Sequence, residues 1–144
     1  MTIIAYDGKC LAVDKAAVIS DMRHKVTKIK KTKSGTILAW CGSNEYGLIL
    51  CRWYQNGADP DKWPEFQRDE NWVRLVVVEN GKVFYYEQEP EPQFIEDRFF
   101  AWGSGRDFAM GALAMGATAE QAVEIASRYN IYCGLGCDVI QIKD

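Results

Sequence analysis

The sequence is poor in histidine and in long apolar runs. His24 is the only histidine in 144 residues and lies in a basic stretch, so a histidine-rich metal site is excluded. No apolar run approaches the roughly 20 residues that a membrane helix needs. No secretory leader is visible either. We therefore expect neither a metal nor a membrane partner.

Cysteine and positive charge are also limited. The five cysteines are an odd number scattered through apolar segments, which is typical of reduced thiols in a cytoplasmic protein. Cys133 and Cys137 have no second pair upstream, so we expect no metal and no other cofactor. The net charge is −3, and the basic run Arg23–Lys33 lacks interleaved aromatic residues. These features argue against a nucleic-acid partner.

The composition is that of a globular protein. Hydrophobic residues make up 48% of the chain and aromatic residues 12%. A chain of this length can bury a sizeable core, and it contains no internal repeat and no linker-like segment. We predict a single domain over residues 1–144.

The N-terminal part is predicted to consist of strands. Thr2–Tyr6 and Lys9–Asp14 flank a hairpin turn signal, Asp-Gly. Ala16–Ser20 continues extended, and alternation along Asp21–Lys33 predicts one strand with charged flanks. Thr36–Cys41 is apolar on both faces, so we expect it to be covered on both sides of its sheet.

The middle of the chain is predicted to hold a helix and a hairpin. Ser43 is the expected N-cap of a helix that ends at Asn56-Gly57. Ala58–Glu70 contains two prolines and many charges, and is expected to be a surface loop. Trp72–Val78 and Lys82–Glu87 are joined by an Asn-Gly turn, the strongest short-range hairpin signal.

The last part predicts a strand, two helices and a final strand. Phe99–Trp102 runs into Gly103-Ser104-Gly105, and a helix over Arg106–Met115 follows. A capping box at Thr118 begins a helix that reaches about residue 130, and Asp138–Lys143 alternates as a strand. This order predicts an α+β fold, a four-layer αββα sandwich of two mainly antiparallel sheets between helix layers.

The N-terminus carries a candidate nucleophile. Thr2 is small enough to permit removal of Met1, which would leave a threonine with a free α-amine. Such an amine can act as the base that activates the hydroxyl of the same residue. Because Ile3 follows, only Thr2 can carry this chemistry.

The chain resembles the proteasome β-subunit family, and more closely its HslV-like threonine peptidases, which are N-terminal nucleophile hydrolases. The likeness extends over nearly the whole chain. Five segments in order carry it: Thr2-Ile3-Ile4, Leu11-Ala12-Val13-Asp14, Val26-Thr27-Lys28-Ile29-Lys30-Lys31, Ile37-Leu38-Ala39-Trp40-Cys41-Gly42 and Ala101-Trp102-Gly103-Ser104-Gly105.

The resemblance implies a role for each of five residues. Thr2 would attack the peptide carbonyl, and the positive charge of Lys28 would favour the neutral amine. Asp14 would compensate that charge, and Ser104 would hold the amine or its water. The backbone N–H of Ala39 would be the oxyanion donor. Without the resemblance, Asp14 is a turn residue and Lys28 a solvated member of its basic run.

The resemblance also gives expectations for residues near these five. Ile37 and Leu38, beside the proposed oxyanion donor, would suit an apolar or small specificity pocket. Asn130 and Cys133 stand where the family places an Asp and a Ser near the nucleophile, which puts the rate in doubt. Lys25 and Lys30 are alternative lysines for the position of Lys28.

The function expected from this resemblance is a cytoplasmic threonine endopeptidase that cleaves peptides or unfolded proteins through an acyl-enzyme. The family implies a homo-oligomeric ring and an ATP-dependent unfoldase partner. A catalytically inactive, ring-forming structural or binding protein of the same fold is the alternative. An amidase acting on a small molecule is a third interpretation.

Overall fold

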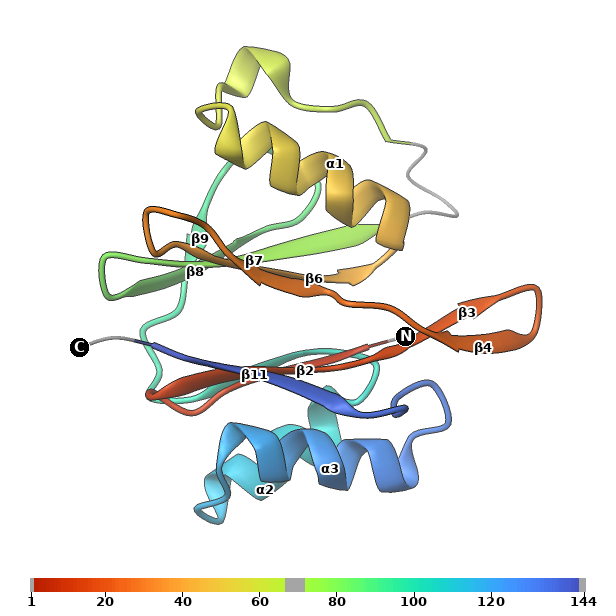
Figure 1. Ribbon diagram of the computed structural model, residues 1–144. Coiled ribbons are helices and arrows are strands. Elements are labelled where there is room, and N and C mark those ends of the chain that lie inside the picture. The colour runs from red at the N-terminus through yellow and green to blue at the C-terminus, as the bar shows by residue number, and fades with distance from the viewer. Residues whose placement is uncertain (1, 67–71, 143–144) are drawn as a thin grey trace.

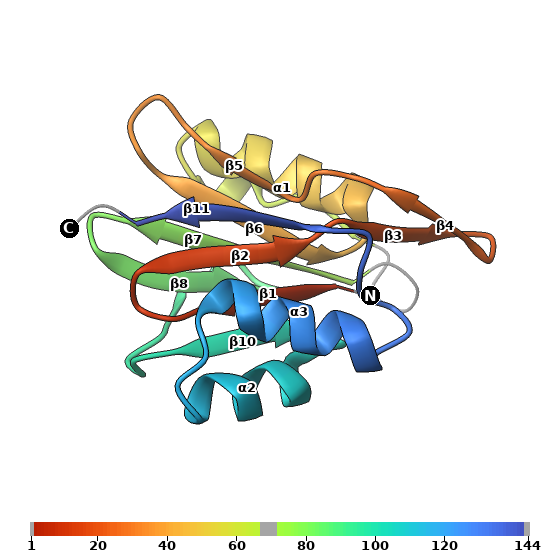
Figure 2. The ribbon, with the colours of Figure 1, turned by 60° about the horizontal axis from the view of Figure 1, so that its bottom comes forward.

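Two antiparallel sheets pack face to face between layers of helices in the computed structural model, which describes residues 2–66 and 72–142 (Figure 1). Helix α1 (Asn44–Gln55) covers the outer face of one sheet. Helices α2 (Arg106–Ala114) and α3 (Ala119–Tyr129) cover the outer face of the other (Figure 2). This arrangement confirms the predicted four-layer α+β fold.

The first sheet holds the N-terminal strand in its interior. Its order is β10-β1-β2-β11, with every neighbouring pair antiparallel. Ile4 of β1 lies opposite Val13 on one side and Trp102 on the other. Thr2, which directly precedes β1, is therefore held from both sides. The bounds are β1 Ile3–Tyr6, β2 Cys10–Asp14, β10 Phe100–Gly103 and β11 Cys137–Gln141.

In the second sheet, β6 lies between β5 and β7 and is buried on both faces, as predicted. Leu38 and Trp40 pack in the layer under α1, whereas Ala39 and Cys41 pack between the two sheets. The predicted Asn-Gly hairpin joins β7 to β8. The order is β5 (Ile29–Lys31), β6 (Ile37–Gly42), β7 (Val73–Glu79), β8 (Lys82–Tyr86) and β9 (Gln93–Phe94).

The prediction of one strand over Asp21–Lys33 was wrong. The segment holds two strands, because β4 (Met22–Lys25) pairs with β3 (Ala16–Ile19) in a separate ribbon before β5 begins. The chain crosses between sheets here: the Val26 N–H donates to the Lys15 carbonyl, and the Lys28 carbonyl accepts from the Trp40 N–H. Alternation continues through the crossing, so the sequence pattern does not reveal it.

The predicted helix caps are confirmed. The Ser43 hydroxyl accepts the Tyr46 N–H, and Thr118 and Gln121 form both bonds of a capping box. Two short elements were missed, the 3₁₀ turn η1 (Pro60–Lys62) and strand β9. Part of the predicted loop, residues 67–70, lies outside the described residues. No helix in the described part of the chain is long and apolar enough to cross a membrane.

Gly103, at the end of β10, lets that strand approach the start of β1. Its φ is +105°, and an added Cβ would collide with the carbonyl oxygen of Thr2. The neighbouring strand therefore fixes the backbone at Thr2 only while residue 103 has no side chain.

We predict that Gly103→Ala destabilises the protein by more than about 3 kcal/mol, because it combines a positive φ with a backbone collision. Gly35→Ala, at φ +94° with nothing within 4 Å, should cost about 1 kcal/mol. Gly111→Ala, in an open part of α2, should be neutral or stabilising. Denaturant unfolding measures all three; equal losses at positions 35 and 103 would contradict the collision.

Candidate active site

Thr2 lies at the bottom of the candidate site and is fully buried. Its backbone N–H donates to the Ser104 hydroxyl at 3.2 Å. Its own hydroxyl oxygen accepts a hydrogen bond from the Lys28 ammonium at 3.0 Å. The two groups that the proposed chemistry needs on this residue therefore each face a polar side chain.

Lys28 is the lysine that reaches Thr2. Besides the Thr2 hydroxyl, its Nζ donates to Asp14 Oδ1 at 2.8 Å and to the Ala16 carbonyl at 2.6 Å. An ammonium has three protons, and three acceptors surround it. Lys25 is exposed on the β3–β4 ribbon, and Lys30 lies within β5 opposite Leu38. Lys28 is thus a buried residue with a fixed head group, and not a solvated member of the basic run.

Asp14 closes β2 and is fully buried. Oδ1 accepts from Lys28 and from the Ile3 N–H at 3.1 Å. Oδ2 accepts from the Gly134 N–H at 3.0 Å and the Ala16 N–H at 3.4 Å. A buried carboxylate is tolerated when a cation and hydrogen-bond donors surround it, and both conditions are met here.

Ser104 sits between two glycines that contact the site. Gly103 abuts Thr2, and an added Cβ at Gly105 would lie 2.9–3.2 Å from Ala126, Cys133 and Ile3. The Gly-Ser-Gly sequence therefore allows β10 and the start of α2 to lie close to β1. As a result, the Ser104 hydroxyl reaches the nitrogen of Thr2.

Asn130 and Cys133 flank Ser104. The Asn130 side-chain Nδ2 donates to the Ser104 carbonyl at 2.9 Å, a bond that an aspartate could not make. The Cys133 sulfur lies 3.8 Å from the Ser104 hydroxyl. Burial, together with the charge of Asp14, raises the pKa of the Cys133 thiol to about 11. The thiol is therefore protonated at neutral pH and acts as a small, weakly polar neighbour.

A pocket of about 260 Å³ opens in front of Thr2 and Lys28. Its walls come from β3 and β4, from the end of β6 and from the first turn of α1. The lining residues are Thr2, Ala16, Ala17, Val18, Ile19, His24, Lys28, Gly42, Ser43, Asn44 and Glu45.

The assignment of Ile37 and Leu38 to a specificity pocket is corrected by the structure. Ile37 is buried between the two sheets and Leu38 is buried under α1. Neither contributes to the pocket at Thr2. These residues lie near the opposite end of β6, so their apolar character serves the core.

The assignment of Ala39 as the oxyanion donor is also corrected. Backbone N–H groups along a strand point alternately to its two neighbours. Since the Trp40 N–H donates toward Lys28, the Ala39 N–H points the other way, toward β7. Gly42 has the same orientation as Trp40, ends β6 beyond the start of β5 and lines the pocket. The backbone N–H at the end of β6 that shares a pocket with Thr2 is that of Gly42.

The residues that sequence reasoning missed act mainly through the backbone. Ala16 offers a carbonyl to Lys28, and Gly134 offers an N–H to Asp14. Neither role has a side-chain signal. The only hint for Gly42 was its position before the Ser43 cap, where a chain leaves a strand. Among the described residues, no group of three or more His, Cys, Asp or Glu side chains is placed to hold a metal ion.

Comparison with solved structures gives matches over the whole chain. A Thiobacillus denitrificans protein, BPH, in complex with epoxomicin matches with a TM-score of 0.72 and 19% identity, covering 100% of both chains. HslV from Trypanosoma brucei matches with a TM-score of 0.74 and 16% identity, covering 99% of both. The chain has the fold of the proteasome-like N-terminal nucleophile hydrolases.

A third structure with this fold is less similar in sequence. A mutant of Anbu from a Hyphomicrobium species has a TM-score of 0.70 at 11% identity, covering 98% of this chain and 81% of Anbu. No profile of a known protein family and no curated protein sequence matches the chain. The proteasome-like fold is thus shared without close sequence similarity.

We predict that Lys28→Met costs about 3–5 kcal/mol of unfolding free energy, because it leaves Asp14 buried without its cation. Lys15→Met is the matched control, since Lys15 pairs with Asp138 at 2.9 Å on a partly exposed surface. That change should cost less than about 1 kcal/mol. Denaturant unfolding at neutral pH measures both, and a Lys28→Met loss no larger than the control would contradict the prediction.

Proposed function

We propose that this chain is a threonine endopeptidase of the proteasome/HslV type, active once Met1 has been removed. The observation that carries the proposal is the buried chain of contacts from the Thr2 hydroxyl through Lys28 to Asp14. A buried ammonium directed at a hydroxyl is costly to maintain for stability alone. Its field stabilises an alkoxide on Thr2, which is what a threonine nucleophile requires.

The reaction begins with proton transfer within Thr2. After removal of Met1, the Thr2 nitrogen is a primary amine, and such amines titrate at about pH 7.7–8.0 in model compounds. The amine accepts the hydroxyl proton, directly or through a water held by Ser104, while Oγ1 bonds to the substrate carbonyl carbon. The carbonyl oxygen then carries the negative charge, and the N–H of Gly42 is the proposed donor to it.

The acyl-enzyme forms in one step and is hydrolysed by water in a second. The amine returns its proton to the leaving nitrogen as the scissile C–N bond breaks, which leaves an ester on Thr2 Oγ1. Water then loses a proton to the amine and attacks the ester carbon. The acid product leaves, and Oγ1 regains a proton. Lys28 remains an ammonium throughout and orients Oγ1.

The domain organisation, substrate class and assembly are proposed from the proteasome-like fold. Residues 1–144 form one domain, the substrates are peptides or unfolded polypeptides, and the active form is a cytoplasmic homo-oligomeric ring. A ring that encloses its sites protects folded proteins from an unselective peptidase. An ATP-dependent unfoldase is the proposed partner that would supply substrate to such a chamber.

The second candidate function is a ring-forming structural or binding protein without activity. Two observations favour it. Thr2 is fully buried, and Asn130 and Cys133 replace the Asp and Ser expected near the nucleophile. Because Asn130 donates to the Ser104 carbonyl, it cannot orient the amine as a carboxylate would.

Intact-mass measurement and covalent labelling test the proposal. We expect the protein purified from cells to lack Met1. We also expect epoxomicin, the ligand in the BPH complex, to form a covalent adduct that peptide mapping places on Thr2. Thr2→Ala should abolish the adduct, and Thr27→Ala, at an exposed threonine, should leave it unchanged.

The negative outcomes separate the two candidates. Retention of Met1 in the native protein would rule out the proposed peptidase activity, because Thr2 would then have no free amine. Removal of Met1 without adduct formation favours the inactive ring protein. A particle mass equal to one chain would contradict the ring in both.

A further inference from the structure

Two segments of the chain carry charge of a single sign. Residues 22–33 hold one arginine, five lysines and no carboxylate. Residues 89–97 hold four carboxylates and neither lysine nor arginine. Lys28 belongs to the candidate active site, whereas the other charges of the two segments have no role there.

The fold places these segments at opposite edges of the second sheet. Among the described strands, β5 pairs with β6 alone and β9 pairs with β8 alone. Lys31 ends β5, and Lys33 follows it in the loop to β6. Glu91 precedes β9, and Glu96 and Asp97 follow it. The sheet therefore has a basic edge (Lys31 and Lys33) and an acidic edge (Glu91, Glu96 and Asp97), with β6, β7 and β8 between them.

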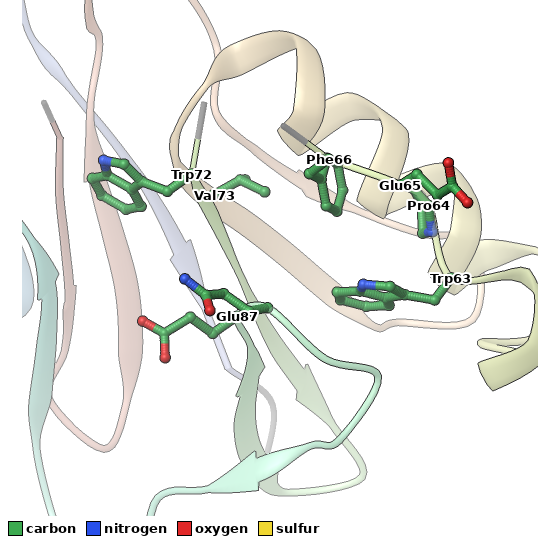
Figure 3. Close-up of a pocket in the computed structure, with 8 residues that line it drawn as sticks. Trp63, Pro64, Glu65, Phe66, Trp72, Val73 and Glu87 are labelled. Atoms are coloured by element: carbon green, nitrogen blue, oxygen red, sulfur yellow. The ribbon is translucent and has the colours of Figure 1, made fainter. Parts of the chain in front are cut away.

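The charges at the two edges face solvent. All five side chains are exposed, and within residues 2–66 and 72–142 none of them forms an ion pair. Glu87, after β8, differs from them. It lines a pocket of about 310 Å³ with Trp72 and Phe66 (Figure 3), and its Oε1 lies 2.6 Å from Nη2 of Arg74. Glu87 is thus paired within the chain, and the charges at the edges are not.

We propose that the acidic edge of one copy of this chain binds the basic edge of a second copy, head to tail. An edge strand offers unpaired backbone groups to another chain, and lysines on it oppose pairing with an identical edge, because like charges repel. The carboxylates oppose self-pairing of the acidic edge in the same way. Opposite charges favour contact between the unlike edges and fix its orientation.

The separation of charge selects a type of symmetry. A contact between two different surfaces of the same chain is heterologous, and its repetition closes into a ring when the rotation between copies allows it. A contact between two identical edges would stop at a dimer. The inference therefore adds to the proposed homo-oligomeric ring the two faces that meet in it, and it does not depend on peptidase activity.

Both edges also have apolar residues beside their charges. Phe94, within the acidic edge, is 53% exposed. A hollow of about 410 Å³ lies beside Lys31 and Lys33, and its lining includes Ile37 and Ile142. Apolar area removed from water contributes binding free energy, whereas the charges select the partner and the orientation.

Charge reversal followed by native mass spectrometry tests the proposal. We expect the wild-type particle to contain several chains. Lys31→Glu with Lys33→Glu reverses the basic edge, and Glu91→Lys with Glu96→Lys and Asp97→Lys reverses the acidic edge. Each of these two variants alone should fall to the mass of one chain, because its two edges then carry like charge. An equimolar mixture should reassemble into particles that contain both variants in equal numbers, since every edge then meets an unlike edge.

A control and a separate assay distinguish the outcomes. Arg52→Glu with Lys62→Glu, at exposed residues of α1 and η1, changes the net charge as much as the basic-edge variant and should keep the wild-type mass. Circular dichroism should show that every variant is folded. Dissociation of the control, or a mixture that stays at single chains, overturns the pairing of the two edges. Unchanged mass in both reversal variants overturns the edges as the interface and leaves the ring in place.

The remaining outcomes separate the interface from the proposed function. A wild-type particle with the mass of one chain overturns both the ring and the interface. Epoxomicin labelling of Thr2 is measured independently of particle mass. Its absence from a wild-type particle of several chains therefore counts against the peptidase and not against the contact between the edges.

Discussion

The buried contact between Asp14 and Lys28 is the constraint on which the rest of the site depends. A charge removed from water must be met by an opposite charge and by hydrogen bonds, or it destabilises the fold. The donors to Asp14 come from the start of β1, from β3, from the segment before β5 and from the loop after α3. Satisfying this one carboxylate therefore brings four separate parts of the chain together. Thr2 lies where they meet.

The small residues around the site follow from the same constraint. Once Ile3 is tied to Asp14, β1 has a fixed position, and β10 must approach it closely at Gly103. Gly105 then allows α2 and α3 to close over Ile3. The Ser104 hydroxyl is directed at Thr2 because both of its neighbours lack side chains. The serine's position is thus a consequence of backbone packing.

Sequence reasoning succeeded where side chains carry the chemistry. Thr2, Asp14, Lys28 and Ser104 have charges or hydroxyls that a motif can show, and the structure brings all four together. Their catalytic roles stay predictions. The sequence-based assignments of Ile37 and Leu38 to a specificity pocket, and of Ala39 as the oxyanion donor, were wrong. Alternation along a strand shows which residues share a face of the sheet, but not where the neighbouring strand begins. Gly42 lies beyond the β5 pairing, which starts at Ile29, and lines the pocket.

Asn130 holds the Ser104 backbone through a hydrogen bond that a carboxylate could not donate. A carboxylate there would accept hydrogen bonds and add negative charge beside Cys133, whose pKa burial and the charge of Asp14 already raise. An asparagine instead donates to the Ser104 carbonyl, and its Oδ1 accepts the Tyr132 N–H. It ties the loop after α3 to the Gly-Ser-Gly turn without a second buried charge. The same loop supplies the Gly134 N–H to Asp14. Asn130 therefore supports the buried Asp14–Lys28 pair from a distance, by fixing a loop that the pair requires.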